Sequence, residues 1–259
     1  YFKNNKLLIP YFTYGDPNTD FTENLVLKSV EEGADIIELG IPFSDPVADG
    51  PVIQASHHRA LSRSQNVTVL SAFQMIKRLK KTISTPIIVM LSVNLVLHHS
   101  VKPFFNLAKE YGVDGVVIPD LSFEDSKDYL RASKLSKVPL IYLISPVCSD
   151  ERIHQIVKAS SGFVYLISSL GTTGERKTIS SKLKNSVSKI KAIKDIPVVV
   201  GFGISKKEHL KQIYKYADGV IIGSYFVKKI HTYLTKPGKA LLSISKSIRE
   251  FKSDTGKTS

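Results

Sequence analysis

The stretch from Glu38 to Pro51, ELGIPFSDPVADGP, sets three carboxyl groups among apolar residues, prolines and glycines. It holds no Lys or Arg that could neutralise Glu38, Asp45 or Asp49. A carboxyl group in an apolar wall has a raised pKa and can donate a proton, while one in a loop stays ionised. Two carboxyls in such different environments suit general acid–base chemistry, so Glu38 and Asp49 are candidate catalytic residues. Asp45 precedes a proline and is better explained as a turn former.

Three glycine-containing turns could bind a phosphate group. They are SLGTTGER (169–176), GFGIS (201–205) and IIGS (221–224), and each follows a short apolar run. Glycine lets backbone N–H groups approach a phosphate, and the N-terminus of a following helix adds partial positive charge. Any tight turn between a strand and a helix can use glycine, so it is the combination of the three that predicts a phosphate site.

Eight short apolar runs position these residues, and stretches of helical period lie between them. Each run is nearly continuous in β-branched residues or Leu, as parallel strands covered on both faces require. Three runs follow an aspartate, namely Asp35, Asp114 and Asp218. The runs are LLIPYF (7–12), DIIELG (35–40), PIIVML (86–91), GVVIPD (115–120), PLIYLI (139–144), GFVYLI (162–167), PVVVGF (197–202) and GVIIGS (219–224).

This repetition, without a linker or a break in composition, predicts an α/β fold with a single (β/α)8 TIM barrel. We expect one domain over 1–259, with a C-terminal amphipathic helix at about 237–252. A doubly wound open sheet is the alternative. Barrel active sites lie at the C-terminal ends of the strands, which is where Glu38 falls. Its alternative role is that of a solvated carboxylate at a strand end.

The composition favours a cytoplasmic globular protein. Its 259 residues are 42% hydrophobic and 23% charged, far from the composition of disordered chains. The single Cys148 cannot form an internal disulfide, and no apolar run approaches the roughly 18 residues of a membrane helix. The net charge of +13 would suit nucleic acid, acidic lipid or an anionic small substrate. The lysines recur at helical spacing opposite apolar residues, which favours solvated helix faces, so we expect no nucleic-acid or membrane partner.

Other residues with reactive side chains are weaker candidates. The pairs His57-His58 and His98-His99 lack the carboxylate or cysteine neighbours of a metal site, so we expect surface histidines and no metal. Asp120 ends the fourth run and has two interpretations, a helix cap and a residue facing the site.

The long motif ELGIPFSDPVADGPVIQ closely resembles the signature of the tryptophan synthase α subunit family. Similar stretches continue along nearly the whole chain: YFTYGDP, GVDGVVIPDL, SSGFVYLIS, GFGIS and ADGVIIGS. The resemblance implies a lyase of tryptophan biosynthesis, which cleaves indole-3-glycerol phosphate to indole and glyceraldehyde 3-phosphate by a retro-aldol route. It also implies that indole passes to a β subunit in an α2β2 heterotetramer. Pyridoxal phosphate would belong to that β partner, with no cofactor on this chain.

The resemblance also implies roles for individual residues. Glu38 would protonate the indole C3 and assist loss of the glycerol hydroxyl proton. Asp49, ionised, would stabilise the charge that develops at the indole N–H, and Tyr165 would be a supporting hydroxyl. Substrate contacts would come from Tyr11, Ile53, Ser92 and Thr173, with Thr173 positioning Asp49. Phosphate contacts would come from Gly174, Phe202, Gly203, Gly223 and Ser224.

Some positions depart from the family pattern. Ser92 and Val93 stand where tyrosines are usual, and Tyr11 stands where Phe is usual. These changes motivate a second hypothesis, an α subunit with weak or no cleavage activity that mainly binds and activates its β partner. A third hypothesis is another phosphate-binding barrel, such as a sugar-phosphate lyase or isomerase. A fourth is a basic nucleic-acid binder.

Overall fold

The protein is described by a computed structural model that covers residues 2, 6–64, 66–145, 147–168, 181–201 and 207–253. All strand pairs in it are parallel. The strands are β1 (Leu7–Thr13), β2 (Ile37–Gly40), β3 (Ile87–Met90), β4 (Gly115–Val117), β5 (Leu140–Ile141), β6 (Leu143–Ile144), β7 (Val164–Ile167), β8 (Val198–Gly201) and β9 (Gly219–Ile222). Each of the eight predicted runs is therefore confirmed as a strand, with the fifth divided into two pieces.

The sheet closes into a barrel at the fifth run. The strand order is β5-β4-β3-β2-β1-β9-β8-β7-β6, and only Tyr142 separates β5 from β6 along the chain. The two ends of the order are thus one continuous run, which pairs with β4 through its first half and with β7 through its second. The predicted TIM barrel is confirmed, and the open doubly wound sheet is excluded.

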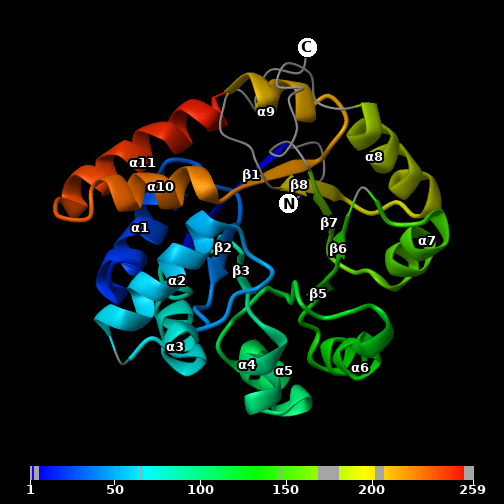
Figure 1. The fold of residues 1–259 in the computed structure, drawn as a ribbon, viewed down its shortest axis with the longest axis horizontal. Helices are drawn as coiled ribbons and strands as arrows, with labels where there is room; N and C mark the ends of the chain where they lie inside the picture. The colour runs from blue at the N-terminus through cyan, green and yellow to red at the C-terminus, as the bar shows by residue number, and fades with distance from the viewer. Residues whose placement is uncertain are drawn as a thin grey trace.

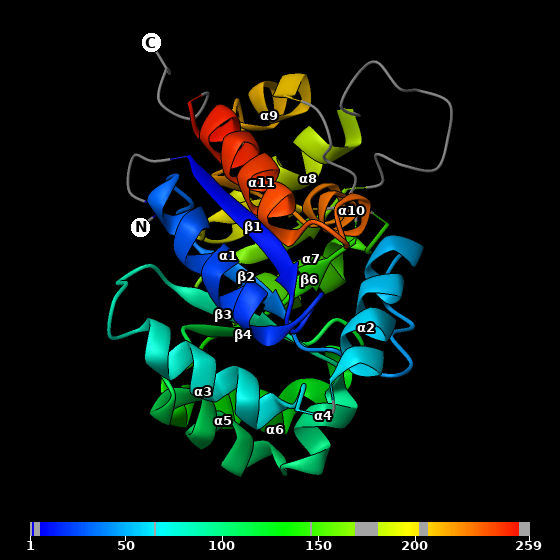
Figure 2. The same ribbon diagram turned by 90° about the vertical axis from the view of Figure 1, so that its left-hand side faces the viewer.

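Helices surround the strands in a ring (Figure 1), and Figure 2 shows α1 and α11 side by side on the outside of β1. None of the described helices is long and apolar enough to cross a membrane. The helices are α1 (Thr19–Glu31), α2 (Pro51–Arg63), α3 (Val69–Leu79), α4 (Val93–His98), α5 (Val101–Glu110), a 3-10 turn η1 (Glu124–Ser126), α6 (Lys127–Ser136), α7 (Asp150–Ala159), α8 (Ser181–Ile193), α9 (Lys207–Ile213), α10 (Ser224–Thr232) and α11 (Pro237–Lys252).

Strand residues alternate between two apolar layers. Those that point into the barrel form one buried cluster, while their neighbours along each strand pack outward against the helices in a second cluster. This alternation fixes which side chains can reach the mouth of the barrel. The interior cluster includes Leu7, Ile9, Tyr11, Ile88, Met90, Val117, Ile141, Tyr165, Val199 and Ile221.

Aspartates before three strands fasten the opposite, N-terminal end of the barrel. The Asp114 carboxylate accepts a hydrogen bond from the Ile87 backbone N–H at 2.7 Å, and the Asp114 N–H donates to the Ile87 carbonyl at 2.9 Å. Asp35 makes the same two-point contact with Leu8, and Asp218 makes it with Val198. Each carboxylate also pairs with a lysine, which locks the register of adjacent strands at the end remote from the predicted chemistry.

Candidate active site

Glu38 points into the barrel and is completely buried. It lies beside Tyr11 of β1 and Ile88 of β3 in the strand register, and both of those side chains belong to the interior cluster. Neither carboxyl oxygen has a hydrogen-bond partner among the described residues. Burial, followed by the nearby charge of Asp49, raises the Glu38 pKa from 4.5 to about 8. A carboxyl group in this environment keeps its proton near neutral pH and can act as an acid.

Asp49 lies at the end of the loop that joins β2 to α2. Gly50 is the N-cap of α2 and Pro51 begins the helix, so the carboxylate is presented next to a fixed helix start. The Gln54 side chain donates to the Asp49 carbonyl at 2.8 Å, which holds the backbone of the loop. Burial, followed by the charge of Asp120, raises the Asp49 pKa from 3.8 to about 6. Asp49 is therefore ionised at pH 7, while Glu38 is protonated.

Two buried tyrosines face the same space because glycines on the neighbouring strands make room for them. A Cβ atom at Gly40 would collide with the Tyr11 hydroxyl oxygen, and one at Gly201 would collide with the Tyr165 ring. Burial raises the pKa of Tyr11 and of Tyr165 well above the usual value. Both phenols therefore stay protonated and can donate hydrogen bonds.

These side chains line one cavity of about 390 Å³ at the C-terminal end of the strands. Seven residues that the sequence singled out meet there, namely Tyr11, Glu38, Asp49, Ile53, Tyr165, Gly223 and Ser224. Thr173, Gly174, Phe202 and Gly203 lie outside the described residues. Within the described part of the chain, no group of three or more His, Cys, Asp or Glu residues could hold a metal ion.

Ser92 lies beside this cavity rather than in its wall. Its hydroxyl donates to the Asp120 carboxylate at 2.6 Å, and the Val93 N–H at the start of α4 donates to the same carboxylate at 2.8 Å. Asp120 therefore caps a helix and also faces Asp49, so both interpretations from the sequence hold. Ser92, Asp120 and Asp49 share a small adjoining cavity of about 20 Å³.

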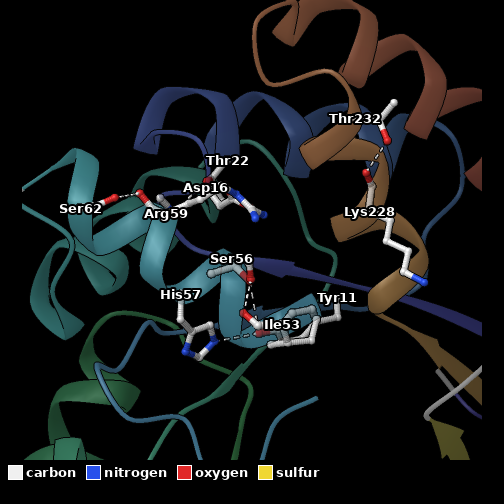
Figure 3. A network of polar contacts seen from close by, with 12 residues as sticks. Tyr11, Asp16, Thr22, Ile53, Ser56, His57, Arg59, Ser62, Lys228 and Thr232 are labelled. Carbon is white, nitrogen blue, oxygen red and sulfur yellow. Dashed lines mark hydrogen bonds and ion pairs between the residues drawn. The ribbon is translucent and has the colours of Figure 1, made fainter. Parts of the chain in front are cut away.

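His57 was expected at the surface, and this expectation is wrong. The residue is only 4% exposed, and its Nε2 lies 3.3 Å from the Tyr11 hydroxyl (Figure 3). Its Nδ1 accepts a hydrogen bond from the Phe43 N–H. Burial lowers the pKa of His57 to about 4, so the ring is neutral at pH 7. The contact of 3.9 Å between Nε2 and Asp49 Oδ2 is thus not an ion pair. The sequence did contain a signal for this burial. His57 follows Ile53 by four residues, and residues four apart share a helix face.

The other end of the cavity is the N-terminus of α10. Gly223 is its N-cap and Ser224 its first residue, and the first N–H groups of a helix have no intrahelical acceptor. Lys228, four residues after Ser224, also lines the cavity, and its side chain extends away from Thr232 toward the first turn of the helix (Figure 3). Lys228 was not predicted from the sequence, because a lysine on an amphipathic helix is ordinarily solvated. Backbone donors and the Lys228 ammonium group make this end of the cavity suited to an anion.

The chain is similar to known proteins over nearly its whole length. A family model described as "Tryptophan synthase alpha chain" matches residues 2–255. The tryptophan synthase alpha chain of Geobacillus thermodenitrificans is 44% identical over 234 residues, which are 90% of this chain and 86% of the relative. That of Petrotoga mobilis is 37% identical over 251 residues, with 97% and 96% covered.

Solved structures agree with this comparison. A structure of the tryptophan synthase α2β2 complex from Pyrococcus furiosus contains a chain that superposes with a TM-score of 0.88 at 38% identity. The superposition covers 96% of this chain and 98% of that one.

Proposed function

Since this chain belongs to the tryptophan synthase alpha chain family, we propose that Glu38 and Asp49 perform the carbon–carbon cleavage by which that family converts indole-3-glycerol phosphate to indole and glyceraldehyde 3-phosphate. The observation on which this assignment rests is the pairing of the two carboxyls in one cavity with opposite protonation states at pH 7. The chain is accordingly a lyase of tryptophan biosynthesis.

The first step is protonation of the substrate. Glu38 donates its proton to C3 of the indole, which leaves a positive charge on the ring nitrogen. Asp49 is ionised and stabilises that charge through the indole N–H. No Lys or Arg occurs between Glu38 and Pro51 to neutralise Asp49, so its full charge is available to the cationic intermediate.

The second step breaks the carbon–carbon bond. The Glu38 carboxylate takes the proton from the glycerol hydroxyl next to the bond, and the hydroxyl carbon becomes the aldehyde of glyceraldehyde 3-phosphate. The bonding electrons return to the indole ring and neutralise its nitrogen. Glu38 ends the cycle protonated, so one carboxyl serves as acid and then as base. Tyr165 supplies a supporting hydroxyl, while Tyr11 and Ile53 pack against the substrate.

The phosphate would be anchored at the start of α10 by the backbone of Gly223 and Ser224. We assign Gly174, Phe202 and Gly203 to the same anchor and Thr173 to the positioning of Asp49, as the family resemblance implies. Remote anchoring energy orients the reacting end of the substrate over the two carboxyls. Ser92 supports the pocket from behind through Asp120 rather than touching the indole.

We further propose that the whole chain works as one cytoplasmic domain in an α2β2 complex with a tryptophan synthase β subunit. The supporting observation is the Pyrococcus furiosus relative, whose solved structure is of such a complex. Indole would pass directly to the β subunit, which holds pyridoxal phosphate, while this chain holds no cofactor.

The assignment is tested by mixing the purified full chain with a β subunit and measuring indole release from indole-3-glycerol phosphate. We expect turnover by the wild type, and a loss of at least about 100-fold in kcat for Glu38→Gln and for Asp49→Asn with folding intact. Unchanged turnover in either variant would refute its catalytic role. A silent wild type that still accelerates the β reaction would support the activator hypothesis instead.

A further inference from the structure

We propose that Tyr11 and His57 form a positioning pair that holds the ionised Asp49 carboxylate in place with neutral hydrogen-bond donors. The inference rests on the proposed function, because it concerns the charge that Asp49 must present to the substrate. It assigns a role in this site to a histidine outside the catalytic motif.

The hydrogen bonds of His57 fix which of its nitrogens bears the proton. Nδ1 accepts from the Phe43 backbone N–H at 3.3 Å, so in the neutral ring the hydrogen is on Nε2. The Nε2–H faces the Tyr11 oxygen at 3.3 Å and the Asp49 Oδ2 at 3.9 Å. The ring is therefore a neutral donor located between the phenol and the carboxylate.

The Tyr11 hydroxyl provides a second donor. Its oxygen accepts from His57 (Figure 3), and its nearest other partner is Thr13 Oγ1 at 3.5 Å. Thr13 uses its own proton in a shorter contact of 2.6 Å with Ser56 Oγ, because the Ser56 proton goes to the Ile53 carbonyl. The Thr13 oxygen is then only a distant acceptor for Tyr11 at 3.5 Å, so the phenolic proton can point into the cavity, where Asp49 lies.

Asp49 needs such donors because its other neighbours disfavour its charge. Burial and the charge of Asp120 both act against its ionisation. Glu38 and Tyr165 also face Asp49, and both are protonated and uncharged at pH 7. A lysine would ionise Asp49 more strongly, but it would also compete with the cationic indole for the carboxylate. A neutral chain in which His57 donates to Tyr11 and Tyr11 faces Asp49 supports the anion without neutralising it.

The test compares matched variants of the full chain in complex with a β subunit. His57→Leu removes the donor at similar volume, whereas His57→Gln keeps an amide N–H near the position of Nε2. Tyr11→Phe removes only the hydroxyl. The exposed neighbour His58→Gln is the control. Indole release is measured against pH and substrate concentration, with the free energy of unfolding measured beside it.

We expect kcat to fall about 10-fold for His57→Leu and for Tyr11→Phe, with KM within about two-fold and most of the rate restored in His57→Gln. Losing a donor to the carboxylate raises the Asp49 pKa, so the acid limb of the kcat profile moves to higher pH. The double variant should lose less than the product of the two single effects. An unmoved acid limb, or a His57→Gln variant as slow as His57→Leu, would overturn the proposal.

A measurement on the unmodified protein complements these variants. Nitrogen-15 NMR of the histidine rings should show His57 neutral, with its proton on Nε2, at pH 6; an imidazolium or a proton on Nδ1 would overturn the pair. An inactive wild type, or an Asp49→Asn variant that stays active, would remove the proposed function and this inference together. An active wild type whose pair variants behave like His58→Gln would overturn the inference alone.

Discussion

The buried position of Glu38 predicts a specific dependence of stability on pH. In the unfolded chain a glutamate ionises near pH 4.5, whereas in the folded protein Glu38 retains its proton up to about pH 8. Between these values the folded state binds more protons than the unfolded state, so the free energy of unfolding decreases as pH rises. Glu38 destabilises the fold in this interval, and the full cost is reached only above pH 8.

The size of the effect follows from the two pKa values. A pKa raised from 4.5 to about 8 corresponds to about 5 kcal/mol above pH 8, and to a change of about 3 kcal/mol between pH 5 and pH 8. Glu38→Gln removes this titration while nearly preserving shape. The variant should therefore gain about 3 kcal/mol of stability relative to the wild type on going from pH 5 to pH 8.

Urea unfolding of both proteins at pH 5, 6.5 and 8 measures this change directly. A buried amide without a partner has a cost of its own, but that cost does not depend on pH, so the slope is the informative quantity. Glu151→Gln, at an exposed glutamate, is the control and should show less than about 0.5 kcal/mol of change. The difference in stability between the wild type and Glu38→Gln could instead stay constant from pH 5 to pH 8. That result would refute the claim that Glu38 is protonated in the folded protein.

Three further expectations follow from the same structure. The kcat for indole release should show a bell-shaped dependence on pH. It should decrease below about pH 6, where Asp49 takes up a proton, and above about pH 8, where Glu38 loses the proton that it must donate. A profile that is flat across both limbs would contradict the two roles. Val47 and Val147 are 71% and 90% exposed on loops at the catalytic end of the barrel. Val47→Asp and Val147→Asp should each weaken binding of the β subunit about 10-fold or more, as measured by calorimetry. The control Leu242→Asp, on the outer helix α11, should leave this binding unchanged. Asp114→Ala removes the acceptor for the Ile87 N–H and should cost about 1 to 3 kcal/mol in urea unfolding, whereas Glu110→Ala, which breaks only an exposed pair with Lys77, should cost less than about 0.5 kcal/mol.

The barrel was predictable from the sequence because continuous apolar runs have few other uses in a chain of ordinary composition. What the runs could not show was their register. Closure of a barrel staggers adjacent strands, so the fifth run pairs with β4 at Leu140 and Ile141 but with β7 at Leu143 and Ile144. The stagger is a property of the closed sheet and leaves no local trace in PLIYLI.

The site was predictable where a residue type was unusual for its place. A carboxyl at the end of an apolar strand pointed to Glu38, and the glycines before α10 pointed to Gly223 and Ser224. The burial of His57 was missed because histidine is a polar residue type, which is expected on the solvated face of an amphipathic helix. Whether such a residue is buried depends on which side chains of other elements pack against it. The partner that buries it is Tyr11, 46 residues earlier in the chain.

Helix α2 explains why chemistry in the β2–α2 loop depends on contacts elsewhere. The helix begins at Pro51, two residues after Asp49, and turns Ile53 and His57 toward the site, so a rotation of the helix would move all three residues together. Arg59 fastens the helix from another side by a two-pronged hydrogen bond to Asp16, at 3.0 and 2.7 Å, in the loop after β1. Burial raises the Asp16 pKa even against the attraction of Arg59, so the pair contributes placement rather than net stability. Tyr11 lies on β1 just before this loop, and His57 lies on α2. The contact between Arg59 and Asp16 therefore helps to hold the two residues of the positioning pair in fixed relative positions.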